Sequence, residues 1–134
     1  MLQVTICPAS PSQCYPDLTA PELTLPSTTV NGDRVEFQLD VPNHAQFPNA
    51  LFEPAPDLAA CGLNTSASRT WVDIYDGNGN YLFGFCALYN ASDLNNIWFA
   101  TAVDQWPAEA YITLTDRRCN IIYTSNRINL AQIL

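Results

Sequence analysis

The sequence predicts an all-β sandwich built as a single domain, and three observations support this class. The run at 34–41 alternates apolar and polar side chains with a period of two, which is typical of a half-buried strand. Apolar, β-branched and aromatic runs recur between Asp, Asn and Gly turns, and no stretch shows helical spacing. The chain has 134 residues and is 48% hydrophobic, so it can bury one sizeable core.

Seven segments have the pattern of strands. In the second of them, Val35, Phe37 and Leu39 form an apolar face. The turn at 77–80 joins two β-rich runs into a hairpin, and the run at 117–120 joins the last two strands in the same way. We expect a single helical turn near Asp93. The predicted strands are 22–25, 34–41, 69–76, 81–88, 95–103, 110–116 and 121–130.

Residues 1–20 are predicted to be an extended, proline-rich leader ahead of a sandwich domain at 21–134. Prolines recur every few residues in the leader and exclude a helix. Within it, residues 2–7 (Leu-Gln-Val-Thr-Ile-Cys) are β-prone, and such a segment can add to an open sheet edge of a neighbouring copy. A second irregular segment, 42–68, has four prolines and no clear period, so it is predicted to be a long loop.

The order of the seven segments resembles that of immunoglobulin-like and fibronectin type III-like domains. The closing stretch, Tyr111-Ile-Thr-Leu-Thr-Asp116 followed by Tyr123-Thr-Ser-Asn126-Arg-Ile128-Asn-Leu130, is similar to the last hairpin of many bacterial modules of this kind. The resemblance covers about residues 20–130 and implies a seven-stranded antiparallel immunoglobulin-like β-sandwich. The sequence departs from the antibody pattern because its second and sixth strands carry no cysteine. The resemblance therefore concerns architecture and assigns no functional residue.

Cysteine spacing predicts disulfides rather than a metal site. The five cysteines have no Cys-x-x-Cys spacing, and the only histidine, His44, has no cysteine within ten residues. Disulfides in a small domain indicate an oxidising compartment, so we expect a secreted, extracellular or cell-surface protein. The cysteines are Cys7, Cys14, Cys61, Cys86 and Cys119.

The resemblance also suggests how the cysteines pair. In that topology the loop before the third strand and the last hairpin share one end of the sandwich, which favours a Cys61–Cys119 bridge. Cys7 and Cys14 would then close a small loop of their own, leaving Cys86 as a buried spare. A Cys61–Cys86 bridge is the rival arrangement.

The charge of the chain excludes two classes of partner. Thirteen acidic residues face five arginines and no lysine, for a net charge of −8. Nucleic acid and anionic membranes both need a cationic face, so neither is an expected partner. No apolar run approaches the length of a membrane-spanning helix, so membrane insertion is not expected either.

Aromatic residues predict a binding surface. If Val72 and Ile74 face the core, Trp71 and Tyr75 point outward. The implied topology places Tyr111 and Thr113 on the same outer face, with Tyr81, Phe83 and Phe85 extending it, and Trp106 as a second contact. A face rich in aromatic and hydroxyl groups suits a sugar or another protein. Two alternatives remain open: the leader covers this face, or the assigned phase is wrong by one residue. The candidate binding residues are Trp71, Tyr75, Trp106, Tyr111 and Thr113.

No metal, cofactor or catalytic site is predicted. Asp73, Asp76, Asn78 and Asn80 offer oxygen ligands, but counting from Asp76 a calcium loop needs glycine where Tyr81 stands. It also needs a glutamate at position 87, where the sequence has alanine. A histidine-based nucleophilic site would have to use His44, and no partner in the sequence suggests one.

Two functions follow from these features; a third hypothesis, an enzyme or inhibitor grafted on the same scaffold, has no substrate that the sequence suggests. The first is a non-enzymatic extracellular binding or adhesion module that holds a protein or glycan ligand. The alternative is a self-assembling subunit of a surface filament or matrix, a homo-oligomer in which the N-terminal strand pairs with another copy.

Overall fold

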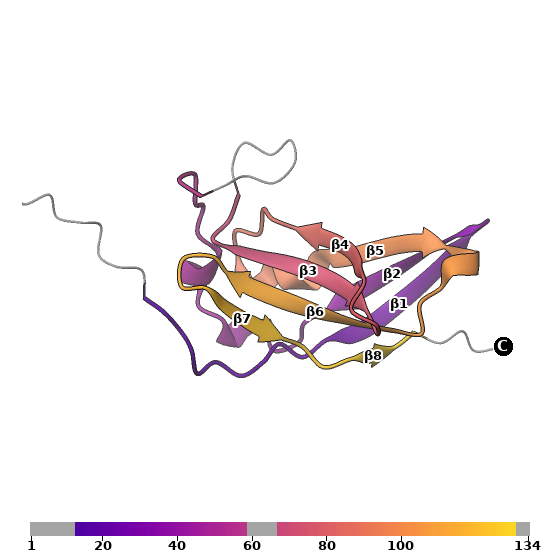
Figure 1. Cartoon of the computed structure of the whole chain (residues 1–134), viewed down its shortest axis with the longest axis horizontal. Coiled ribbons are helices and arrows are strands. Elements are labelled where there is room, and N and C mark those ends of the chain that lie inside the picture. The colour runs from indigo at the N-terminus through magenta and orange to yellow at the C-terminus, as the bar shows by residue number, and fades with distance from the viewer. Residues whose placement is uncertain (1–12, 59–66, 131–134) are drawn as a thin grey trace, which may run out of the picture.

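The computed structural model describes residues 13–58 and 67–130, which form two antiparallel sheets packed face to face (Figure 1). The first sheet has the strand order β1-β2-β5. The second has the order β4-β3-β6-β7, and β8 continues it beside β6. The predicted all-β sandwich is therefore confirmed. The strands within these residues are β1 (Thr24–Asn31), β2 (Arg34–Asp40), β3 (Thr70–Asp76), β4 (Tyr81–Phe85), β5 (Ile97–Ala102), β6 (Glu109–Asp116), β7 (Ile121–Thr124) and β8 (Ile128–Asn129).

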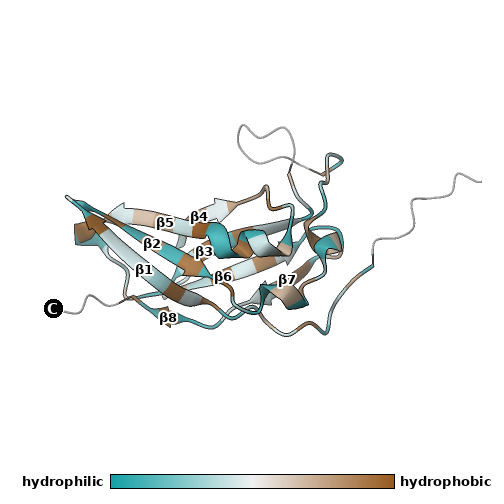
Figure 2. Cartoon of the chain, turned by 180° about the vertical axis from the view of Figure 1, so that it is seen from behind, coloured by the Kyte–Doolittle hydropathy of each residue, from teal (hydrophilic) through white to brown (hydrophobic). Residues whose placement is uncertain are grey.

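The core lies between the sheets and is built by strict alternation along the central strands. Val35, Phe37 and Leu39 of β2 are fully buried, and the alternation is visible as bands along the ribbon in Figure 2. Phe37 stacks on Phe99 of the paired strand β5 with ring centroids 4.8 Å apart. Burying each such ring stabilises the fold by about 1.5–3 kcal/mol.

The first strand is longer than predicted. The sequence favours a strand only at 22–25, because Pro26 argues against its continuation, yet β1 runs from Thr24 to Asn31. Its pairing with β2 shifts register between Thr24 and Ser27, so Pro26 falls at an irregularity. β1 is also the edge of its sheet, where a missing backbone N–H costs little.

Three other strands differ from the prediction at their boundaries. The strand expected at 81–88 ends at Phe85. The strand expected at 95–103 begins at Ile97, because the preceding residues form the 3-10 turn η3 (Ala91–Asn96). The strand expected at 121–130 splits into β7 and β8. Between them, the Ser125 hydroxyl accepts the backbone N–H of Ile112 at 2.9 Å and interrupts the ladder.

The segment after β2 packs against the core rather than forming an open loop. It contains the 3-10 turns η1 (His44–Gln46) and η2 (Asn49–Phe52), neither of which was predicted. Phe47, Leu51 and Phe52 are almost fully buried. A further 3-10 turn, η4 (Val103–Gln105), follows β5.

The described part of the leader packs against its own domain. The backbone oxygen of Gln13 accepts from Arg69, and that of Tyr15 accepts from the Tyr123 hydroxyl. The backbone oxygen of Thr19 accepts a hydrogen bond from the Gln46 side-chain amide at 3.0 Å. The β-prone segment at 2–7 lies outside the described residues.

The leader is also held covalently. Cys14 is bonded to Cys119, at a sequence separation of 105. The expected Cys61–Cys119 and Cys7–Cys14 bridges are therefore wrong, because docking of residues 13–20 brings Cys14 to the β6–β7 turn. Cys86, expected to be spare, is disulfide-bonded as well. Cys7 and Cys61 lie outside the described residues.

A buried ion pair lies at the same end of the sandwich. Arg69 is 1% exposed and Asp116, the last residue of β6, is 0% exposed. The Arg69 guanidinium donates to both Asp116 carboxylate oxygens at 2.8 and 2.9 Å. It also donates to the backbone oxygens of Ala50 and Gln13, which ties three segments together. Hydrogen bonding to Asp116 raises the pKa of Arg69 above its already high ordinary value.

Candidate binding face

The outward side of the second sheet carries the predicted aromatic surface, which we call the outer face. In β3, Val72 and Ile74 are fully buried, while Trp71, Asp73 and Tyr75 are partly exposed. In β6, buried residues alternate in the same way with partly exposed Tyr111, Thr113 and Thr115. The residues of the two strands pair across the sheet as Trp71 with Thr115, Asp73 with Thr113, and Tyr75 with Tyr111.

The edge strand β4 contributes Tyr81 and Gly84 to this face. Tyr81 pairs with Tyr75 and is 61% exposed, and Gly84 pairs with Asp73. Phe83 and Phe85, expected on the outer face, instead pair with the core residues Ile74 and Val72.

That expectation is wrong because a register shift changes the phase of β4. The shift lies between the pairs of Ile74 and Tyr75 and inserts Leu82 as an extra residue in β4. A one-residue shift moves every following side chain to the other side of the sheet. Phe83 is therefore directed round the edge, where its ring lies 6.0 Å from that of Trp98 on β5.

Three tyrosines form one row across the outer face. Tyr75 stacks on Tyr111 with centroids 5.3 Å apart and meets Tyr81 edge-on at 6.1 Å. The guanidinium of Arg127 lies over the Tyr111 ring, 4.8 Å from its centroid. Tyr111 is thus already contacted by an aromatic ring and a cation of its own chain.

Trp71 lies on the same outer face, at the end away from the three tyrosines. The guanidinium of Arg117, in the turn after β6, lies 4.1 Å from the centroid of this ring. The indole N–H is buried and has no hydrogen-bond partner among the described residues. Sequence reasoning did not find either stacking arginine, because each lies outside the strand whose ring it covers.

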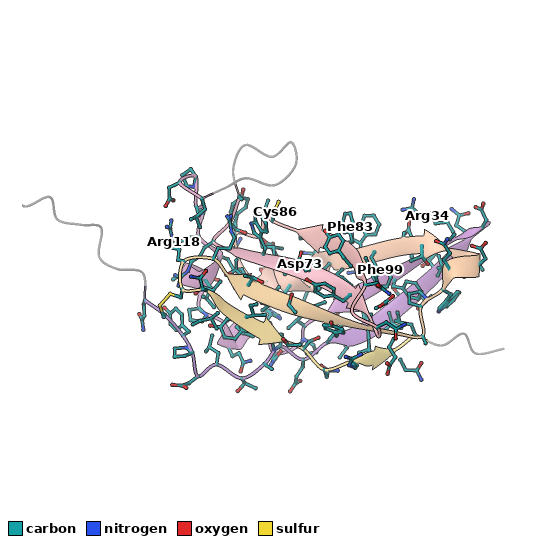
Figure 3. All side chains as sticks on the ribbon, in the orientation of Figure 1. Arg34, Asp73, Phe83, Cys86, Phe99 and Arg118 are labelled. Atoms are coloured by element: carbon teal, nitrogen blue, oxygen red, sulfur yellow. A yellow bond between two sulfur atoms is a disulfide. The ribbon has the colours of Figure 1, made fainter. Side chains whose placement is uncertain are left out.

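A row of smaller residues crosses the sheet between Trp71 and the tyrosines, and we call it the polar row. It consists of Gly84 on β4, Asp73 on β3, Thr113 on β6 and Thr124 on β7, which are successive partners in the sheet. Figure 3 labels Asp73 near the middle of the sandwich, between Arg118 at one end and Arg34 at the other.

Asp73 is the only charged residue of the polar row and has no hydrogen-bonding partner in the described part of the chain. Burial without such a partner raises the pKa of its carboxyl group above the ordinary value. Burial, followed by the negative charge of Asp73, likewise raises the pKa of Tyr81.

Gly84 leaves the space in which these two groups approach each other. A Cβ atom at position 84 would meet the Tyr81 hydroxyl at 2.6 Å and the Asp73 Oδ1 atom at 2.9 Å. Real Cβ atoms do not come this close to other atoms, so glycine allows Tyr81 to lie across β4 beside the carboxylate. The sequence signal is the single glycine that interrupts the aromatic run Tyr-Leu-Phe-Gly-Phe.

The remaining candidate, Trp106, does not belong to the outer face. Its ring packs edge-on against Phe37 of the core with centroids 5.3 Å apart. Its indole N–H donates to the backbone oxygen of Leu130. Trp106 therefore closes one end of the core, whereas Trp71, Tyr75, Tyr111 and Thr113 are brought together.

The other side chains considered from the sequence, Asp76 and His44, make hydrogen bonds or close polar contacts within the fold. The Asp76 carboxylate accepts hydrogen bonds from the backbone N–H groups of Asn78 and Asn80 within the hairpin turn. His44 Nδ1 lies 2.9 Å from the backbone oxygen of Val41 and 3.2 Å from the Asn95 amide. Across residues 13–58 and 67–130, no three His, Cys, Asp or Glu side chains come together as a metal site would require.

Comparison with protein-family models, curated proteins and solved structures gives no match for this chain. In the described ranges, no helix is both long and apolar enough to span a membrane. The arrangement of the outer face therefore carries the functional argument.

Proposed function

We propose that this chain is a non-enzymatic extracellular binding or adhesion module of immunoglobulin-like fold, whose outer face holds a protein or glycan ligand. The sheet orders β1-β2-β5 and β4-β3-β6-β7 support the finer fold assignment, because they are the two sheets expected for such a domain. The Cys14–Cys119 bridge supports an oxidising location.

The observation that carries the proposal is the setting of Asp73. A carboxylate that is partly removed from water and accepts no hydrogen bond from the described residues carries its charge less favourably than one in bulk water. Rings on both sides of it add partly exposed apolar area. Functional surfaces commonly combine apolar contact area with a few polar groups that a ligand must satisfy.

The proposal is tested by binding assays on glycan arrays and on defined extracellular proteins, comparing Tyr81→Ser with Val30→Ser. Both residues are exposed to a similar extent, 61% and 56%, but Val30 lies on β1 of the other sheet. We expect a ligand of the wild-type chain to lose affinity for Tyr81→Ser and to keep it for Val30→Ser. Equal loss in both variants, or no ligand for the wild type, would contradict the proposal.

A second candidate, self-assembly by strand addition, is favoured by the β4 edge. Among the described strands β4 pairs with β3 alone, and it has neither charge nor proline to discourage another strand. In this proposal residues 2–7 of one copy pair with β4 of the next. The test is light scattering on the full chain and on a chain lacking residues 1–12, a truncation that keeps Cys14 and its bridge. Oligomers formed only by the full chain would support assembly, whereas two monomeric samples would refute it.

A further inference from the structure

We propose that the polar row receives a cationic side chain, an arginine or a lysine, from an extended basic segment of a protein partner. The inference rests on the proposed function and names the chemistry of the ligand. It follows from three properties: a carboxylate on the outer face to which no described residue donates a hydrogen bond, rings on either side of it, and the charge of the whole chain.

The first property is that, among the described residues, no group donates a hydrogen bond to the Asp73 carboxylate, which is partly exposed to water. Of the chain's own cations, Arg117 and Arg127 lie on the same face, but each is stacked on a ring in a neighbouring row. The raised pKa of Asp73 has burial as its only cause, with no contribution from either arginine. A ligand that brings N–H donors and a positive charge would supply to Asp73 what the described residues do not.

The second property is the ring on each side of the carboxylate. Trp71 and Tyr75 are the neighbours of Asp73 on the outward side of β3, and Tyr81 lies beside it across Gly84. A carboxylate flanked by aromatic rings suits a cation that hydrogen-bonds to the acid and lies against the rings. The same chain already holds guanidinium groups against Trp71 and Tyr111, which indicates that this geometry is accessible on this face.

The ring contacts also argue against a sugar as the main ligand. A pyranose stacks on an open ring face, and the guanidinium groups cover Trp71 and Tyr111. A bound calcium ion needs six or more oxygen ligands, and the polar row offers one carboxylate. A single side chain with a positive charge needs only the one carboxylate that is present.

The third property is charge complementarity. With a net charge of −8 and no lysine, the chain attracts a basic partner at long range and repels an acidic one. The polar row runs across four strands, so an extended segment lying along it would pass Thr113 and Thr124 after placing its cation at Asp73. The threonine hydroxyls can hydrogen-bond to the backbone of such a segment.

The experiment follows the backbone and indole N–H resonances of the full chain by nuclear magnetic resonance. The probes are N-acetyl-arginine amide and N-acetyl-lysine amide, with N-acetyl-citrulline amide as the uncharged match for arginine and maltose as a sugar probe. We expect the two cationic probes to shift Gly84, Thr113 and the Trp71 indole, and citrulline to leave them unchanged. Asp73→Asn should weaken the response about tenfold or more, because a hydrogen-bonded charge pair is lost.

Asp33→Asn is the matched control, since it removes the same charge from the exposed turn between β1 and β2. It should respond as the wild type does. Asp73→Asn keeps the shape of the side chain and removes a charge that no described residue pairs with, so we expect it to fold.

The outcomes separate this inference from the proposed function. Equal shifts with citrulline and arginine, or shifts with maltose alone, would overturn the cationic ligand while leaving the outer face as a binding surface. An unchanged response of Asp73→Asn to arginine would also overturn it. If no probe shifts the face, the inference fails, and the array comparison of Tyr81→Ser with Val30→Ser still decides the proposed function.

Discussion

Two aspartates of the second sheet show opposite ways of holding a charge away from water. Asp116, at the end of β6, is completely buried and is paired with Arg69 through two short hydrogen bonds. Asp73, in the middle of β3, is only partly buried, yet it has no hydrogen-bond donor in the described chain. The more deeply buried charge is the better satisfied. We infer that Asp116 serves the fold, whereas Asp73 serves a ligand.

The largest expected effect comes from breaking the satisfied pair. Asp116→Asn leaves the Arg69 guanidinium buried without its counter-charge, which should lower the free energy of unfolding by about 3–5 kcal/mol. Urea denaturation measures this change. Asp57→Asn is the control, since Asp57 also binds an arginine, Arg118, but is exposed and should matter little. Similar stability of the two variants would refute a structural role for Asp116.

The bridge beside that pair should have the next largest effect. Replacing both Cys14 and Cys119 with serine removes a link that closes a very long loop, so we expect a loss of about 2–5 kcal/mol. Reductant is a poorer test, because Cys86 is bonded too. The same variant should free the backbone oxygen of Gln13 from Arg69, and hydrogen exchange at residues 13–20 would report this release. Unchanged protection there would show that the noncovalent contacts suffice.

A smaller effect on stability is expected where Arg117 lies over the ring of Trp71. Arg117→Gln removes both the guanidinium contact with Trp71 and the hydrogen bond from Arg117 to the backbone oxygen of Ser68, and should cost about 1–2 kcal/mol in total. Thermal unfolding measures this loss. Arg34→Gln is the control for the loss of an arginine charge, because Arg34 makes an exposed ion pair with Glu36 and touches no ring in the described contacts. If both variants unfold alike, the stacked cation adds nothing to the outer face.

The smallest effect has the opposite sign. Asp73→Asn removes an unsatisfied charge and should raise the free energy of unfolding at pH 7 by about 0.5 kcal/mol. Because the folded pKa of Asp73 is raised, the folded wild type binds more protons than the unfolded chain between the two pKa values. The wild type should therefore lose stability as pH rises through that window, and the variant should lose less. A destabilised variant would mean that the carboxylate has a structural partner.

The sequence predicted the parts of the fold that repeat locally. Alternation identified the inward phase of β2, β3 and β6, and turn residues marked the hairpins, because both signals lie within a few neighbouring residues. It also indicated that Trp71, Tyr75, Tyr111 and Thr113 share a face. Asp116 could have been recognised as buried, since it continues the phase of the apolar residues of β6.

The remaining features depend on contacts between distant residues. The Cys14–Cys119 bridge and the Arg69–Asp116 pair join segments that only the folded chain brings together. The register shift that turns Phe83 away from the outer face depends on how β4 pairs with β3. No local pattern encodes that pairing, so the phase of β4 had to come from the structure.

The most direct test of the contrast between the two aspartates is a carboxyl-carbon magnetic resonance titration of Asp73 in the full chain, free and with N-acetyl-arginine amide. We expect the free chain to titrate above the ordinary aspartate value of about 3.9, and the bound chain to titrate lower than the free one. An ordinary pKa in the free chain, unchanged by the probe, would show that Asp73 is a solvated surface acid and would contradict its assignment to a ligand.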